Sequence, residues 1–178
     1  MKSGSNKKTS IARLSVASNS LLIAMKFTIG IISGSVSIIS EAIHSSMDLV
    51  AALIAFFAVR VSDTPPDSRH PYGHGKVENI SGVIEGLLIL VAAFVIIMEA
   101  VKKLLGSHTL PESVWIGAVV MLISGIVNIY VSRRLYKVAR ETGSLALEAD
   151  ALHLKTDVYT SLGVAAGLGL IYFTGIVW

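Results

Sequence analysis

The sequence contains no cysteine, which excludes disulfide bonds and thiolate metal ligands. Any bound metal ion must therefore be held by nitrogen and oxygen atoms. Charged residues are also scarce, at 15% of the chain, against about a quarter in an average soluble protein. With 53% apolar residues and a mean hydropathy of +0.70, this composition argues against a soluble domain.

Long apolar runs dominate the chain instead. A hydrocarbon core about 30 Å thick is crossed by about 20 mostly apolar helical residues. Five runs of this length predict spans near residues 12–32, 36–61, 80–101, 114–133 and 144–172. No internal repeat of 20 to 50 residues is apparent. The predicted fold class is an all-α membrane protein, with one bundle of transmembrane helices over residues 1–178.

The distribution of positive charge predicts the orientation, because cytoplasmic loops carry an excess of Lys and Arg. Eleven of these residues lie around the N-terminus and in the loops after the second and fourth runs, whereas the other side has only Lys102 and Lys103. The N-terminus, with a polar tail over residues 1–10, is therefore predicted to be cytoplasmic. The basic residues form separate short clusters rather than one stripe, so no nucleic-acid partner is expected.

Two of the predicted spans carry the same pair of ionisable residues. The second contains His44 and Asp48, and the fifth contains His153 and Asp157. The i, i+4 spacing places both members of each pair on one helix face. Ionisable groups inside a span cost a few kcal/mol each, so two such pairs call for a functional reason.

The depth of the two pairs supports a shared site. At about 1.5 Å of rise per residue, Asp48 and Asp157 both lie about 20 Å from the cytoplasmic ends of their helices. Two imidazole nitrogens and two carboxylate oxygens suit a tetrahedral Zn²⁺ site. Fe²⁺, Co²⁺, Ni²⁺, Cd²⁺ and Mn²⁺ stay open, because geometry and supply rather than raw affinity usually decide which metal is bound.

A second group of possible ligands lies in the loop between the second and third spans. Asp67, His70 and His74 fall within eight residues, on a segment shaped by proline and glycine. They could hold a second, more exposed metal ion. An ordinary polar loop explains the same residues equally well.

The remaining membrane charges are less informative. Lys26, Glu85, Glu99 and Lys155 receive no role from the sequence. Glu148 and Asp150 are placed near the cytoplasmic start of the fifth span, where they would attract cations or simply belong to a solvated helix end.

These motifs resemble the cation diffusion facilitator family, close to its bacterial and archaeal branch of zinc and ferrous-iron efflux proteins. The resemblance covers nearly the whole chain. It is carried by Gly34-Ser35-Val36-Ser37 leading to Glu41 and the first His-Asp pair, by the loop from His70 to Glu78, and by Ala149-Asp150-Ala151-Leu152 leading to the second pair.

The resemblance implies a homodimeric antiporter in a prokaryotic plasma (inner) membrane, which exports metal from the cytoplasm in exchange for protons by alternating access. Its motif positions assign His44, Asp48, His153 and Asp157 to the transport site. Asp67, His70 and His74 take the positions of a loop site found in some members. Members that have a histidine rather than an aspartate at the first position of the span-two motif are associated with a preference for Zn²⁺ over Cd²⁺. Members that transport Mn²⁺ tend to lack these histidines.

The family pattern has six spans followed by a cytoplasmic metal-binding domain. The sequence is therefore expected to be a truncated piece that stops before the sixth span, with the C-terminal span and cytoplasmic domain absent. The expected partners are the metal ion, protons, the lipid bilayer and a second copy in the full-length protein.

The residues also bear on three other functions. An intramembrane metalloprotease needs an open coordination position and a general base, and the His-Glu-x-x-His motif is absent, so no enzyme activity and no catalytic cofactor are expected. A structural membrane protein that uses the metal ion only to hold its helices together would bind the ion without dependence on protons.

A channel is disfavoured because four ligands hold an ion too firmly for fast conduction. Proton coupling fits histidine ligands, which must lose their protons to bind metal.

Overall fold

The computed structural model describes residues 2–105 and 114–174, and the side chains within them except those of residues 2–5, 36–37, 99–100, 103–105, 114–115, 160–161 and 164–174. This part of the chain forms helices and no strand. The helices are α1 (Lys2–Ser33), α2 (Val36–Ser62), α3 (Lys76–Leu105), α4 (Val114–Thr142) and α5 (Leu145–Thr174). The predicted all-α fold is confirmed.

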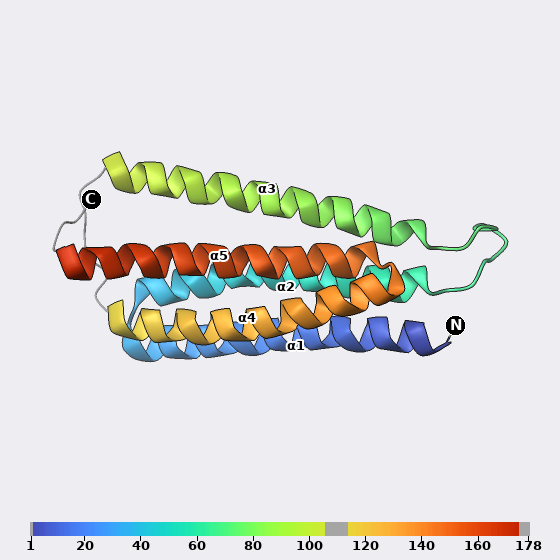
Figure 1. Cartoon of the computed structure of the whole chain (residues 1–178), viewed down its shortest axis with the longest axis horizontal. Coiled ribbons are helices and arrows are strands. Elements are labelled where there is room, and N and C mark those ends of the chain that lie inside the picture. The colour runs from blue at the N-terminus through green and yellow to red at the C-terminus, as the bar shows by residue number, and fades with distance from the viewer. Residues whose placement is uncertain (1, 106–113, 175–178) are drawn as a thin grey trace.

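The helices run alternately up and down along one long axis (Figure 1). The N-terminus, the α2–α3 loop and the α4–α5 turn lie at one end, which we call the loop end. The α1–α2 turn lies at the opposite end, which we call the turn end. Helix α5 packs against α2, α3 and α4, and α1 packs against α2 and α4, while α3 lies to one side. Helices α2 and α5 are therefore antiparallel neighbours in the interior.

Each of the two helical hairpins turns on a Gly-Ser pair. Gly34 ends α1 with a φ of 64°, and Gly143 ends α4 with a φ of 66°, a left-handed conformation that favours glycine. The following residues, Ser35 and Ser144, donate their backbone N–H to the carbonyl oxygens of Gly30 and Ala139 at 3.1 Å. Their hydroxyls then accept from the first turns of α2 and α5, as N-caps do.

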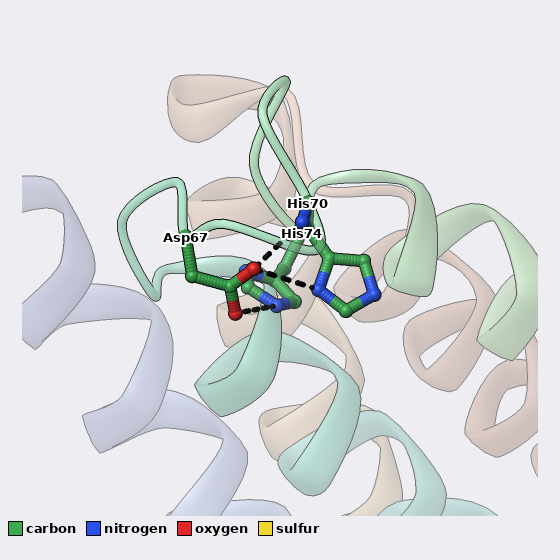
Figure 2. Close-up of side chains that lie close together, drawn as sticks. All are labelled: Asp67, His70 and His74. Carbon is green, nitrogen blue, oxygen red and sulfur yellow. Dashed lines mark hydrogen bonds and ion pairs between the residues drawn. The ribbon is translucent and has the colours of Figure 1, made fainter.

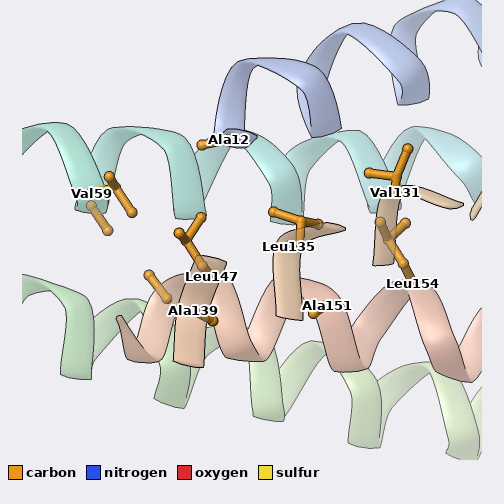
Figure 3. Close-up of a cluster of buried hydrophobic side chains, with 10 residues drawn as sticks. Ala12, Val59, Val131, Leu135, Ala139, Leu147, Ala151 and Leu154 are labelled. Carbon is orange, nitrogen blue, oxygen red and sulfur yellow. The ribbon is translucent and has the colours of Figure 1, made fainter. Parts of the chain in front are cut away.

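The main apolar core lies in the half of the bundle nearer the loop end (Figure 3). Its buried members come from α1, α2, α4 and α5, and α3 adds only the partly buried Val77 at its edge. They are Ala12, Ala58, Val59, Val131, Leu135, Ala139, Ala146, Leu147, Ala151 and Leu154. Small residues among them let the helix backbones approach closely.

Four helices contain stretches long and apolar enough to cross a membrane: Asn6–Ser33, Ile38–Ser62, Lys76–Met98 and Ile116–Thr142. The fifth predicted span falls on α5, where the side chains after residue 163 lie outside the described ones. On α3 the exposed side chains are largely apolar; Val83, Leu90 and Phe94 are each more than 60% exposed. This surface suits lipid rather than water.

The helices extend beyond the predicted spans at their polar ends. Helix α1 begins at Lys2 rather than near residue 12, and α4 continues to Thr142 rather than ending near residue 133. Counting apolar residues finds only the part that suits lipid. The helices continue because polar residues there remain compatible with helix and gain partners, as when Lys8 contacts Asp63 and Glu78.

Candidate metal centre

Three side chains from α2 and α5 meet in the interior of the bundle. Asp48 on α2 and His153 on α5 contact each other at 3.2 Å between Oδ1 and Nε2. Asp157, one turn further along α5, joins them, so that one ligand atom from each of the three lies within 4.8 Å of the others. Asp48 and His153 are buried, and Asp157 is partly buried. The group offers one nitrogen and two carboxylate oxygens to a cation.

His44 is not a member of this group, although it lies one turn before Asp48 on the same helix. Its side chain is partly buried. The antiparallel arrangement explains which residues meet. Asp48 contacts His153, whereas His44 lies one turn from Asp48 toward the turn end, as Asp157 lies one turn from His153 on α5.

The two hairpins, α1–α2 and α4–α5, form an inverted repeat whose period is longer than the 20 to 50 residues typical of repeat proteins. Chemically matching residues stand 109 residues apart, as from 44 to 153. The matched pairs are Ser15 and Ser124, Asn19 and Asn128, Gly34 and Gly143, Ser35 and Ser144, Glu41 and Asp150, His44 and His153, and Asp48 and Asp157. Because the hairpins start at opposite ends of the bundle, they are related as inverted repeats, which in transporters place the ion site at their interface.

The acidic residues three positions before each histidine lie on opposite sides of the site. Glu41 lies toward the turn end, where its Oε1 is 3.0 Å from the Nζ of Lys26 on α1. Asp150 lies toward the loop end and is fully buried, so a solvated helix end does not explain it. Glu85 of α3 is fully buried too, and its Oε1 accepts a hydrogen bond from Ser81 at 2.9 Å. The sequence did not assign a role to Lys26 because its partners lie on a different helix, and it did not show that Glu85 is buried because burial depends on the packing of α3.

The loop residues also come together (Figure 2). Asp67 contacts the Nδ1 of His70 at 3.1 Å through Oδ1 and the Nε2 of His74 at 3.5 Å through Oδ2. The two imidazole rings are 4.4 Å apart. The three residues thus form a second group able to offer two nitrogens and one oxygen to a cation. Asp67 and His70 are exposed, so this group faces solvent.

Backbone donors hold the Asp67 carboxylate in place. The backbone N–H of His70 donates to its Oδ1 at 2.6 Å and that of Arg69 at 2.8 Å. The pKa of Asp67 is held below its usual value, chiefly by the hydrogen bond from the His70 backbone. The bond from Arg69 and the contact with the His70 ring lower it further. The carboxylate is therefore ionised at neutral pH, as a metal ligand must be.

Glu78 connects this loop to the bundle. It lies four residues after His74 in the first turn of α3 and is buried. Its Oε1 accepts from Lys8 at 2.9 Å and from Ser62 at 2.7 Å, and its Oε2 accepts from Ser144 at 2.5 Å. One carboxylate thereby joins α1, the end of α2 and the cap of α5 at the loop end.

A family model described as the cation efflux transmembrane domain matches residues 12–178. The chain belongs to the cation efflux family. This is a family of transporters and not of enzymes, and the four candidate spans agree with an integral membrane protein.

Relatives of this cation efflux domain extend the comparison. It is 37% identical over 94% of its length to the uncharacterized transporter sll1263 of Synechocystis sp., covering 54% of that protein. It is 30% identical over 89% of its length to the cation-efflux pump FieF of Shewanella oneidensis, covering 53%. With the manganese efflux system protein MneP of Bacillus subtilis it shares 29% identity over 89% of its length, covering 52%. The chain spans about half the length of these curated relatives.

Proposed function

We propose that this chain is the ion-conducting part of a proton-coupled exporter of divalent metal ions. The observation that carries the proposal is the meeting of Asp48, His153 and Asp157 between two antiparallel helices of a membrane bundle. Buried carboxylates and an imidazole in a span are costly unless they serve an ion or proton pathway. Membership of the cation efflux family supports the same function.

His44 completes the proposed site as the fourth ligand. The inverted repeat makes His44 and Asp157 the counterparts of His153 and Asp48, and the latter two already touch. A divalent cation between the helices would attract the imidazole of His44 toward Asp157 and give two nitrogens and two oxygens. This donor set favours Zn²⁺, and Fe²⁺ or Mn²⁺ are the principal alternatives because the relatives include a manganese efflux protein.

Proton exchange follows from the ligand chemistry. A histidine binds metal only in its neutral form, so metal and protons compete for the same nitrogens. Metal enters from the loop end, which the positive charges of the tail and loops assign to the cytoplasm. The bundle then rocks, and protonation on the far side expels the ion.

The loop group is proposed as a second metal site, and the full-length protein as a homodimer in a prokaryotic plasma membrane. Two imidazoles and one carboxylate leave one tetrahedral position for water, which suits a site that fills and empties from solvent. The exposed apolar surface of α3 is available to lipid or to a second copy. No catalytic role is assigned to either group.

The test is Zn²⁺ uptake into proteoliposomes that contain the full-length protein and carry a proton gradient. His153→Ala and Asp157→Ala should abolish gradient-dependent uptake, while Glu148→Gln, which alters a neighbouring charge on α5 outside the site, should retain it. Parallel assays with Fe²⁺ and Mn²⁺ rank the metals. Unchanged uptake in both site variants would reject the pathway, and metal bound tightly without release would favour a structural metal instead.

A further inference from the structure

Lys26 is the one lysine or arginine among the residues that the structure describes as buried. It lies on α1 with 4% of its surface exposed. Its Nζ is 3.0 Å from Glu41 Oε1 and 2.6 Å from Ser45 Oγ, both on α2. A buried ammonium needs such partners, because an unpaired charge in a span is costly.

This ion pair is placed against the metal centre. Glu41 and Ser45 bracket His44 on α2, at three residues before it and one after it. Ser45, which accepts from Lys26, is three residues from Asp48, and Asp157 lies one turn from His153 in the direction of the turn end. The pair therefore occupies the side of the centre that faces the turn end.

The inverted repeat exposes an asymmetry between the two sides. Asp150 is the counterpart of Glu41 and lies on the loop-end side, fully buried. The position that corresponds to Lys26 is Leu135, a core residue with no charge. Within the described part of the chain, neither Lys nor Arg forms an ion pair with Asp150. A fixed cation is thus built into one half of the repeat and not into the other.

We propose that Lys26 is a resident cation of the metal centre, held on its turn-end side by Glu41 and competing with the metal ion for the negative charge of Asp157. The inference rests on the proposed function. In the metal-free state Lys26 offsets part of the charge of the buried carboxylates. When a divalent ion binds, the pair with Glu41 keeps the ammonium away from it. When the ion leaves toward the turn end, Lys26 supplies the positive charge that the carboxylates lose.

The proposal predicts opposite effects of two neutralising substitutions on metal affinity. Lys26→Met removes the competing charge and should tighten Zn²⁺ binding about tenfold, because the ammonium no longer offsets the charge of Asp157 or repels the divalent ion. Glu41→Gln releases Lys26 toward Asp157 and should weaken binding about tenfold. The double variant removes both charges and should return to within about threefold of the unaltered protein. Lys26→Arg keeps the charge and should preserve the affinity.

The measurement is calorimetric Zn²⁺ titration of the full-length protein in detergent, with His70→Ala and His74→Ala present in every sample so that the loop does not contribute. Lys26→Gln, which keeps hydrogen-bonding capacity but not charge, repeats the test if Lys26→Met does not fold. Asp150→Asn is the matched control from the other half of the repeat. Asp150→Asn should weaken Zn²⁺ binding by the same factor in the unaltered protein and in the Lys26→Met variant.

Asp157→Asn separates failure of this inference from failure of the proposed function. If Asp157→Asn leaves Zn²⁺ binding unchanged, the proposed metal centre is rejected, and the resident-cation role of Lys26 is rejected with it. If Asp157→Asn abolishes binding while Lys26→Met and Lys26→Gln weaken it or leave it unaltered, only the resident-cation role is rejected. A purely structural ion pair would weaken binding in both Lys26→Met and Glu41→Gln, without the opposite signs.

Discussion

Asp48 and His153 stand 105 residues apart in the chain, yet their side chains meet at 3.2 Å in the interior of the bundle. The contact links the two hairpins, because Asp48 belongs to the second helix of one and His153 to the second helix of the other. A buried carboxylate and a buried imidazole are thereby brought into contact from two different helices. A pathway that opens alternately to each side needs a site built in this way.

Asp48→Asn tests the contribution of this contact to metal binding. The substitution keeps the size of the side chain but removes a charged ligand, so Zn²⁺ affinity should fall by more than about 100-fold, the upper range for residues that only support ligands. Zn²⁺ titration of the full-length protein provides the measurement. Glu78→Gln, which removes a buried carboxylate outside the group, would show whether any loss of buried negative charge has the same effect. Equal losses in both variants would contradict a specific ligand role for Asp48.

Glu78→Gln should destabilise the loop end of the bundle. The carboxylate accepts bonds from Lys8, Ser62 and Ser144, and hydrogen bonds to a charged group contribute about 1.5–3 kcal/mol each at most. We expect a loss of about 2–4 kcal/mol in the free energy of unfolding, because the amide can keep some of these bonds. Thermal unfolding in detergent measures it. Glu148→Gln, a less buried acid at the start of α5, should cost less than about 0.5 kcal/mol, and equal losses would remove the special role of Glu78.

Gly30→Ala and Gly86→Ala should change stability in opposite directions. A Cβ on Gly30 would lie 2.8 Å from Cγ1 and 3.2 Å from the backbone nitrogen of Ile39, where α1 approaches α2. Crowding of this kind costs about 1–3 kcal/mol. A Cβ on Gly86 in α3 meets no atom within 4 Å, so the substitution should stabilise by about 0.5–1 kcal/mol through the helix preference of alanine. Urea or thermal unfolding of the two variants decides the signs.

The Asp67 turn should be insensitive to pH across the neutral range. Its carboxyl pKa in the folded loop is lower than in an unfolded chain, chiefly because the His70 backbone N–H donates to it. The resulting stability is present above the unfolded pKa of 3.8 and is lost only as the pH falls through the lowered folded value. Hydrogen exchange of the His70 backbone amide should therefore show constant protection from pH 8 to pH 5, after correction for intrinsic rates. Protection that faded between pH 7 and pH 5 would assign the turn to the histidines instead.

Metal binding at the loop should nevertheless weaken over the same range. Two of its three ligands are imidazoles, which must give up protons to bind metal. Asp67→Asn should lower the Zn²⁺ affinity of the loop at every pH but leave the slope of affinity against pH unchanged. Titrations at several pH values, in a background with Asp157→Asn to silence the central site, provide the measurement. If Asp67→Asn changed the slope of Zn²⁺ affinity against pH, the Asp67 carboxyl group would have to titrate over this pH range.

The sequence alone determined the helical class, the approximate spans and the face that carries each His-Asp pair. Span length and the i, i+4 spacing are local properties, fixed by the thickness of a bilayer and by the pitch of a helix. Predicted and observed helices accordingly agree in α2, which was placed at 36–61 and runs Val36–Ser62. The polar helix ends, at Lys2 and Thr142, were not predicted because a count of apolar residues finds only the part of a helix that suits lipid.

Only the tertiary structure decided which members of the two pairs meet. The antiparallel packing of α2 and α5 brings Asp48 to His153 and leaves His44 outside the group of three side chains. Tertiary packing also buries Asp150, and the packing of α1 on α2 brings Lys26 to Glu41; local spacing specifies neither. Charges in a membrane interior are positioned by whichever neighbouring helix offers a partner, and that choice depends on helix direction and packing rather than on the residues beside them in the chain.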